Sequence, residues 1–164
     1  MTGHRNLGPD EQTHHYVQNA CHRLLEPLVE LGRLTGAGVH AYSALATGAD
    51  TLFAHAALEL EIPLVGIVPF ADYADDFEGP ERQTFDHLIE RCIEVIRLPR
   101  KRRTNHAYLA AGTTLVQHVD LVVAVWNGLP AKGLGGTGDV VAYAERRECP
   151  VVRIDPSVAG SSPK

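Results

Sequence analysis

Residues 121–154 read LVVAVWNGLPAKGLGGTGDVVAYAERRECPVVRI and hold the pattern that decides the fold. The apolar run over 121–126 predicts a buried strand, and glycines crowd the turn that follows it. Apolar residues at helical spacing over 139–147 predict a helix, and 151–154 predicts a last strand. Strand, glycine turn, helix and strand in this order indicate two parallel strands joined by a helical crossover.

The same alternation extends along the rest of the chain. Strands are predicted over 39–45, 64–68 and 94–98, and helices over 9–31, 50–60, 85–92 and 105–118. Pro27 lies inside the first helix and should kink or shorten it after Glu26. We therefore expect a Rossmann-like, doubly wound, mostly parallel α/β sheet with helices on both faces. It forms one domain over residues 1–155, followed by a disordered Ser-, Gly- and Pro-rich tail over 156–164.

The start of the chain fits this fold less well, because it opens on turn residues, Thr2 to Arg5, and runs straight into a helix. A doubly wound sheet begins with a strand, which lies where the winding reverses. Either that first strand lies upstream of Met1, or the sheet lacks it and closes differently.

Composition limits the partners and the location. The chain has 164 residues and a formal net charge of -5, so neither a nucleic-acid backbone nor an anionic membrane attracts it broadly. No apolar run approaches the roughly 20 residues that span a bilayer, and no secretory leader pattern opens the chain. We expect a cytoplasmic protein in which any anion site is local. Small sheet proteins of this kind often form homo-oligomers, whose number and interface this sequence does not define.

Cysteine and histidine offer no metal or disulfide framework. Cys21, Cys92 and Cys149 are odd in number, far apart and without CxxC spacing, which favours reduced thiols. Nine histidines are present, yet none has HExxH or a similar ligand spacing. We expect no metal site.

Three glycine turns carry the candidate chemistry: TGHRN at 2–6, ATGAD at 46–50 and GLGGTGD at 133–139. Each precedes a helix, so all three should meet at the carboxyl edge of the sheet, where such folds bind ligands. Glycine lets backbone N–H groups approach a phosphate closely, and the helix N-terminus adds partial positive charge. The candidate ligand-binding residues are Gly3, His4, Arg5, Thr47, Gly48, Asp50, Asn127, Gly135, Gly136, Thr137, Gly138 and Asp139.

Several of these residues have two interpretations. Thr137 or Asp139 should cap the last helix, and Asp50 either caps its helix or accepts a hydrogen bond from a ribose hydroxyl. Asn127 either contacts a base or ribose, or only forms a turn with Gly128. His4 and Arg5 should reach a phosphate or sugar.

Gly136 and Arg103 lead to two further expectations. A valine at Gly136 should block the phosphate while leaving the fold intact. Arg103 is either part of a solvated loop or, with Thr104 and Asn105, a flap that reaches a phosphate.

These motifs resemble the SLOG superfamily. SALATGADTLFAHAALELEIPLVGIV at 43–68 is similar to the Ser-Gly-Leu-Ala-x-Gly-Ile-Asp stretch of the DNA-processing protein A family, and the segment from 122 to 152 to the superfamily's phosphate-binding strand, loop and helix. The resemblance implies a Rossmann-like fold and a nucleotide or nucleotide-derived ligand. Lonely guy phosphoribohydrolases of this superfamily carry a glutamate after their glycines, where this chain continues into Val140 and Val141. No catalytic residue can therefore be named.

The first functional hypothesis is a binding or sensing module for a small phosphorylated ligand, a nucleotide or ADP-ribose-like molecule, without a certain cofactor. The second is a nucleotide-processing hydrolase that cleaves an N-glycosidic or phosphate bond, with Asp139 or Glu145 activating water and Arg5 assisting. The third is single-stranded DNA binding, which the negative net charge disfavours.

Overall fold

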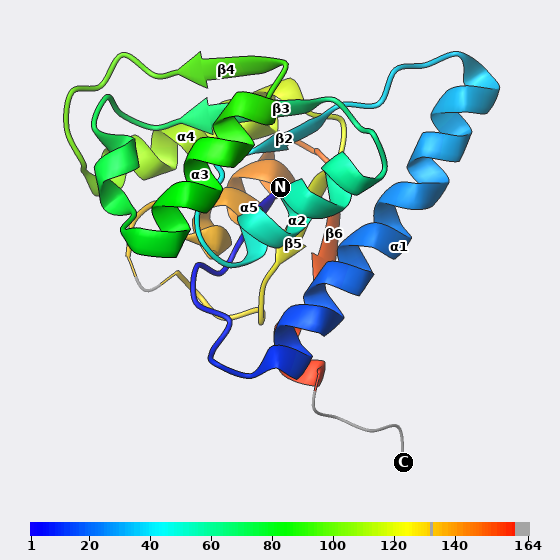
Figure 1. Ribbon diagram of the computed structural model, residues 1–164, viewed down its shortest axis with the longest axis horizontal. Coiled ribbons are helices and arrows are strands. Elements are labelled where there is room, and N and C mark those ends of the chain that lie inside the picture. The colour runs from blue at the N-terminus through cyan, green and yellow to red at the C-terminus, as the bar shows by residue number, and fades with distance from the viewer. Residues whose placement is uncertain (132, 160–164) are drawn as a thin grey trace.

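The computed structural model describes residues 1–131 and 133–159 and confirms the α/β fold. All the strands pair in parallel, and helices alternate with them along the chain (Figure 1). The elements are β1 (Thr2–Gly3), α1 (Glu11–Thr35), β2 (Ala41–Ser43), α2 (Ala49–Glu59), β3 (Leu64–Val68), the 3₁₀ helix η1 (Tyr73–Asp76), α3 (Gly79–Arg91), β4 (Glu94–Arg97), α4 (Asn105–His118), β5 (Val122–Val125), α5 (Thr137–Arg146), β6 (Val151–Ile154) and the 3₁₀ helix η2 (Pro156–Val158).

The strands form two three-stranded parallel sheets, in the orders β1-β5-β6 and β2-β3-β4. β1 is only two residues long, and its residues pair Thr2 with Ala124 and Gly3 with Val125. The Met1 amino group donates a hydrogen bond of 2.8 Å to the carbonyl of Tyr42, which joins the end of β1 to β2. The two sheets therefore lie next to each other with β1 and β2 at the junction.

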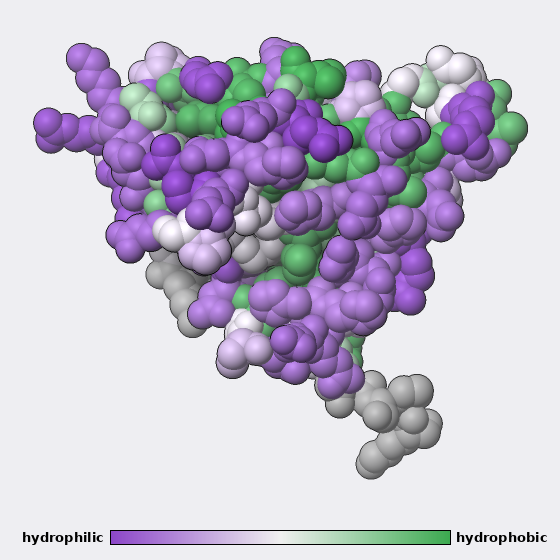
Figure 2. Space-filling view, in the orientation of Figure 1, coloured by the Kyte–Doolittle hydropathy of each residue, from purple (hydrophilic) through white to green (hydrophobic). Residues whose placement is uncertain are grey.

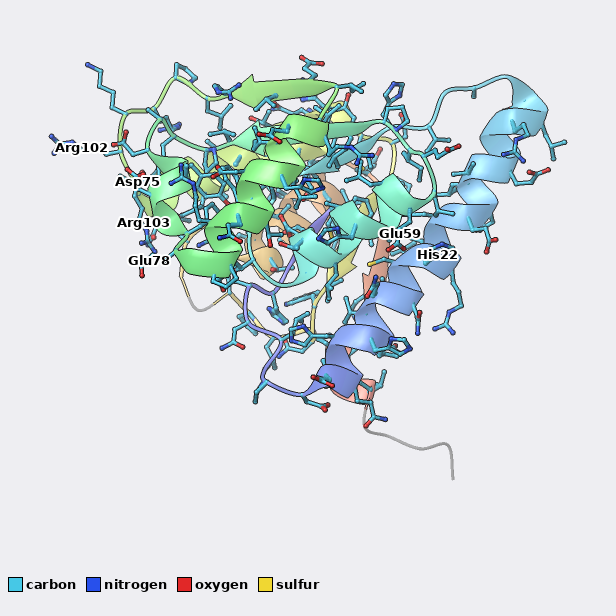
Figure 3. All side chains as sticks on the ribbon, viewed as in Figure 1. His22, Glu59, Asp75, Glu78, Arg102 and Arg103 are labelled. Atoms are coloured by element: carbon cyan, nitrogen blue, oxygen red, sulfur yellow. The ribbon has the colours of Figure 1, made fainter. Side chains whose placement is uncertain are left out.

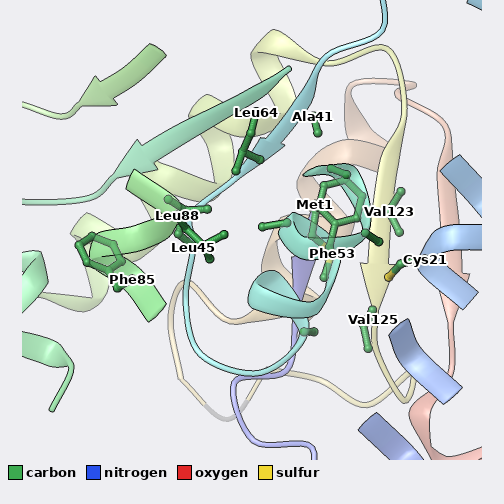
Figure 4. Close-up of a cluster of buried hydrophobic side chains, with 14 of the residues drawn as sticks. Met1, Cys21, Ala41, Leu45, Phe53, Leu64, Phe85, Leu88, Val123 and Val125 are labelled. Atoms are coloured by element: carbon green, nitrogen blue, oxygen red, sulfur yellow. The ribbon is translucent and has the colours of Figure 1, made fainter. Parts of the chain in front are cut away.

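Helices cover both faces of this arrangement. α1, α2 and α3 lie in front in Figure 1, and α4 and α5 lie behind. The front core packs aromatic and aliphatic side chains such as Phe53, Phe85 and Leu88 against the strands (Figure 4). The rear core is smaller and centres on Leu115, Val122 and other aliphatic side chains. The doubly wound, Rossmann-like prediction is confirmed.

The structure corrects the prediction at the start of the chain. A first strand is present, as Thr2–Gly3, where the sequence indicated turn residues and no strand. A strand of two residues has no alternation that a periodicity analysis can detect.

The first helix also differs from the prediction, because α1 continues through Pro27 to Thr35. Pro27 lies on the exposed side of the helix, so the carbonyl that loses its partner faces solvent. The buried side chains of Val17, Cys21 and Leu25 hold the helix on the core up to that point, and Gly32 is buried beyond it.

The tail prediction needs a partial correction. Pro156–Val158 form η2, in which the Asp155 side chain accepts a hydrogen bond from the backbone N–H of Ser157. Residues 160–164 lie outside the described part of the chain. No helix among the described residues is long and apolar enough to cross a membrane.

Candidate functional site

The turns that follow β1, β2 and β5 meet at the carboxyl edge, and His4 joins them. The backbone N–H of His4 donates to the Val125 carbonyl at 3.1 Å, and its carbonyl accepts from Ala49 at 3.1 Å. Its Nε2 accepts the N–H of Asn127 at 3.3 Å. The chain winds in opposite directions on either side of β1, so this junction is the switch point where open α/β sheets bind ligands.

Glycine is required where the β1 and β2 turns cross. Gly48 has φ 82° and ψ -123°, and a Cβ added there would lie 2.3 Å from the Arg5 carbonyl oxygen. Leu45, two residues after β2, is buried with φ 55°, a conformation that strains a residue with a side chain. The β2–α2 turn is thus held in an unusual shape directly against Arg5.

Arg5 packs into an aromatic and acidic cluster at this edge. Its guanidinium lies 4.7 Å from the centre of the Tyr108 ring and donates to the Tyr73 hydroxyl at 3.4 Å. A guanidinium nitrogen also lies 3.9 Å from the carboxylate of Asp76, whose side chain is only 7% exposed. The Tyr108 hydroxyl donates to the same carboxylate. Arg5 is therefore fixed by neighbours while 40% of its side chain stays open to solvent.

A second arginine reaches the same carboxylate from a distant turn. Arg103, just before α4, has its guanidinium 3.5 Å from the other Asp76 oxygen. Figure 3 shows Arg103 near Asp75 and Glu78 at this edge, whereas Arg102 extends away from the molecule. Arg103 is therefore part of the cluster and Arg102 is not. Two guanidinium groups from distant turns therefore face one buried carboxylate at this edge.

The cluster shifts the pKa of its own members. Burial lowers the pKa of Arg5, but Tyr73, Tyr108 and Asp50 raise it and together outweigh burial. Burial and the hydrogen bond to Asp76 raise the pKa of the Tyr108 hydroxyl. Arg5 is thus a fixed cation and Tyr108 a neutral hydrogen-bond donor at ordinary pH.

The third glycine turn packs against this cluster from the side of α4. Gly135 has φ 89°, and a Cβ there would lie 2.6 Å from the backbone nitrogen of Leu109 and 3.0 Å from the Cβ of Tyr108. The Asp139 carboxylate accepts the N–H of Gly135 at 2.8 Å. The glycines therefore let the turn approach α4 closely, and Asp139 fixes the turn ahead of α5.

The structure changes the interpretation of Gly136. A Cβ there would lie 2.9 Å from the Cβ of Ala131, and one at Gly138 would lie 3.0 Å from the Ala131 nitrogen. A valine at Gly136 would therefore displace the turn itself, contrary to the expectation that it leaves the fold intact. Gly3 is likewise packed, since its Cβ would lie 2.5 Å from that of Ala49.

The N-terminus of α5 lacks a side-chain cap. Its N-cap is Gly136, and the N–H groups of Thr137 and Gly138 have no acceptor among the described residues. Neither Thr137 nor Asp139 caps the helix, so the capping prediction is wrong, because the Asp139 carboxylate instead accepts the N–H of Gly135, just before the N-cap. α2 also starts at an uncapped glycine, Gly48. The start of α5 thus leaves backbone donors without an acceptor among the described residues, as anion sites do, whereas at the start of α2 Ala49 and Asp50 are buried and the Ala49 N–H donates to the His4 carbonyl.

Asp50 lies beneath the site rather than at its surface. Asp50 is only 5% exposed, and its carboxylate accepts a hydrogen bond from the Ser43 hydroxyl at 3.4 Å. Burial raises the pKa of this carboxyl to about 6, while the Met1 amine, Arg5 and the Ala46 N–H lower it without offsetting burial. The side chain does not cap α2.

This pKa predicts a pH dependence of stability. In the unfolded chain the carboxyl titrates near 4, so between about pH 4 and 6 unfolding releases a proton and the free energy of unfolding falls as pH rises. The protonated carboxyl thus contributes about 3 kcal/mol to the free energy of unfolding below pH 4, and this contribution is lost above pH 6. Asp50→Asn should remove this slope.

Urea unfolding of the parent chain and of Asp50→Asn at pH 4, 5, 6 and 7 measures this pH dependence. The variant should gain stability relative to the parent chain as pH rises through this range. A constant difference between the two proteins would contradict the prediction. Burial also lowers the pKa of the Met1 amine to about 6. The effect of this amine on the free energy of unfolding therefore lies mainly between pH 6 and 8, outside the range that Asp50 governs.

The other predicted site residues lie around this edge. Asn127 is exposed, and its side-chain oxygen accepts the N–H of Leu129 at 3.2 Å, so it forms the turn that one interpretation predicted. Thr47 is half-buried, and its hydroxyl has no partner among residues 1–131 and 133–159. Glu145 is exposed in the second half of α5, and Cys21, Cys92 and Cys149 are free.

Sequence reasoning missed η1 and therefore missed Tyr73 and Asp76, as well as Tyr108 on α4. The signal was the acidic segment at 72–76, which follows the buried strand β3 at its carboxyl end. Within the described residues, no three His, Cys, Asp or Glu side chains lie close enough together to hold a metal ion.

Comparison with known proteins does not assign the chain to a family. No protein-family model matches the chain, and no curated protein matches it either. The resemblance noted in the sequence motifs therefore stays a prediction.

Proposed function

We propose that this chain binds a nucleotide or nucleotide-derived ligand, such as an ADP-ribose-like molecule, at the carboxyl edge of its sheet. The phosphate lies against Arg5, Arg103 and the N-terminus of α5, and the rest of the ligand follows the β2–α2 turn. Binding or sensing needs no reaction at this site.

One observation carries the proposal. Arg5 and Arg103, 98 positions apart in the sequence, both reach the buried carboxylate of Asp76 at the switch point of the sheet. The separations of 3.9 and 3.5 Å are longer than a good charge-assisted hydrogen bond, so both guanidinium groups keep donors for another acceptor. A phosphate offers planar pairs of oxygens that suit this arrangement.

Affinity in this arrangement comes from several contacts acting together. A helix dipole alone contributes about 0.3–1 kcal/mol, and a hydrogen bond to a charged group about 1.5–3 kcal/mol. Micromolar binding needs roughly 8 kcal/mol, which can be approached together by two arginines and the N–H groups of Thr137 and Gly138, which have no acceptor within residues 1–131 and 133–159. The proposal thus requires that the three turns act on one ligand.

No contact of the described residues favours a hydrolase over a binding module. The Asp139 carboxylate is bonded to the Gly135 N–H, and Glu145 is exposed farther along α5. Neither carboxylate lies in the buried, water-excluded setting of a typical general base.

The experiment is a thermal-shift panel of nucleoside mono-, di- and triphosphates, ADP-ribose, NAD, the corresponding nucleosides and single-stranded DNA. A ligand at 100 times its dissociation constant should stabilise the protein by roughly 2.7 kcal/mol, and for a chain of this length this raises Tm by about 5–11 °C. We expect a shift with one phosphorylated class and none with its nucleoside. A flat panel would contradict the proposal, and released base in the same samples would assign a reaction.

A further inference from the structure

A small pocket lies beside the arginine cluster, between the start of α2 and the start of α3. Its volume is about 130 Å³, and its apolar wall is formed by Leu45, Phe77 and Phe85. The rings of Phe77 and Phe85 stack with their centres 4.6 Å apart. Figure 2 views the molecule from the side of α2 and α3, where a pale, weakly polar area interrupts the hydrophilic surface. The pocket has room for one ring system rather than for a whole nucleotide.

The polar groups of this pocket are mainly acceptors. The Thr51 hydroxyl donates to the Ala46 carbonyl at 2.9 Å, and the Thr84 hydroxyl donates to the Pro80 carbonyl at 3.0 Å. Because their protons are used within the fold, these two oxygens can only accept from a ligand. Glu81 adds a carboxylate that has no hydrogen bond or ion pair within the part of the chain that the structure describes.

The pocket is joined to the arginines by shared residues. Gly48 lines it and lies directly against the Arg5 carbonyl, and Phe77 follows Asp76 in the chain. The carboxylate of Glu81 repels a phosphate, whereas Arg5 and Arg103 attract one. A ligand that occupies both sites must therefore put its phosphate at the arginines and an uncharged ring in the pocket.

We infer that this pocket takes a ring of the ligand that presents two neighbouring hydrogen-bond donors to Glu81. Two parts of a nucleotide have this chemistry: the vicinal hydroxyls of a ribose, and the N1–H and 2-amino edge of guanine. A carboxylate accepts both donors of either group at once. The inference rests on the proposed function and adds to it the part of the ligand that this pocket selects.

Glu81→Gln tests the inference, because it keeps the size of the side chain and replaces one acceptor oxygen by a donor. The matched control is Glu90→Gln, which removes the same charge from another exposed position of the same helix that does not line the pocket. Calorimetric titrations use AMP, 2′-deoxy-AMP, GMP, 2′-deoxy-GMP and IMP with the parent chain and both variants. Melting temperatures show that each variant is folded.

We expect Glu81→Gln to weaken by about tenfold the binding of a nucleotide whose ring fills the pocket, and Glu90→Gln to change its affinity by less than twofold. If the ribose occupies the pocket, AMP and GMP bind alike and their 2′-deoxy forms bind more weakly. If guanine occupies it, GMP binds more tightly than IMP or AMP, and the deoxy form is equivalent.

Two results would overturn the inference in distinguishable ways. Nucleotide binding that Glu81→Gln leaves unchanged overturns the pocket assignment alone and leaves the proposed function standing. Failure of the parent chain to bind any member of this series or of the thermal-shift panel overturns the proposed function and the inference together.

Discussion

Gly48→Ala is expected to lower the free energy of unfolding by about 3 kcal/mol or more, which corresponds to a loss of about 6–12 °C in Tm for a chain of this length. Two costs add at this position. With φ 82° and ψ -123°, Gly48 has a backbone conformation that a residue with a Cβ rarely adopts. A Cβ would also lie 2.3 Å from the Arg5 carbonyl oxygen and 2.7 Å from that of His4, and both are backbone atoms that cannot rotate away.

Gly8→Ala separates these two costs. Gly8 has nearly the same φ, 81°, but a Cβ there meets nothing within 4 Å. The control should therefore lose only about 1 kcal/mol, the conformational part. Thermal and urea unfolding of the two variants and the parent chain give the comparison. Equal losses at Gly8 and Gly48 would mean that the β1 and β2 turns do not touch as the structure has them.

Buried parallel strands and a capped helix were the parts of the fold that the sequence predicted best. Leu64–Val68 and Val151–Ile154 have the predicted bounds, because each is a run rich in β-branched apolar residues with clear breaks on both sides. Asn105–His118 also has the predicted bounds, since Thr104 caps the helix and its apolar residues recur at helical spacing. Local pattern and tertiary packing agree in these segments.

The missed parts depend on contacts between distant residues. β1 is a strand only because two residues pair with β5, and α1 continues past Pro27 because packing outweighs one lost hydrogen bond. Among the site residues, His4 and Arg5 were predicted from the glycine turn at 2–6, and they lie at the junction of the two sheets. Asp76 and Tyr108 could not be paired from the sequence, because 32 positions separate them and η1 has no periodicity of its own.

The role of the glycines was the hardest part to read from the sequence. Glycine turns predict close backbone approach, but the sequence does not say what approaches. At Gly48 and Gly135 the close atoms belong to the protein, since Arg5 and Leu109 occupy the space where a Cβ would lie. Under the proposed function, the donors to the phosphate are therefore Arg5, Arg103 and the start of α5 rather than the glycine turns. This division of roles makes the arginines, rather than the glycines, the residues whose replacement tests binding.

Arg5→Gln is accordingly expected to weaken binding of the phosphorylated ligand by about 10- to 100-fold, the effect of losing a charge-assisted hydrogen bond of about 1.5–3 kcal/mol. Arg103→Gln should have a smaller effect, because its side chain is 66% exposed against 40% for Arg5 and loses more freedom on binding. Arg102→Gln removes the same charge from the neighbouring position, whose side chain extends into solvent (Figure 3), and should leave affinity unchanged.

Arg5→Lys distinguishes recognition from simple charge attraction. Lysine keeps the positive charge but not the planar fork that can bind Asp76, Tyr73 and a phosphate together. We expect Arg5→Lys to bind the nucleotide almost as weakly as Arg5→Gln does. Both variants should lose more affinity for the nucleotide than for its nucleoside. Calorimetric titration at a temperature where all variants are folded measures these differences. If Arg5→Gln and Arg102→Gln weakened binding equally, the two arginines would act only through net charge, and the cluster around Asp76 would not be the phosphate site.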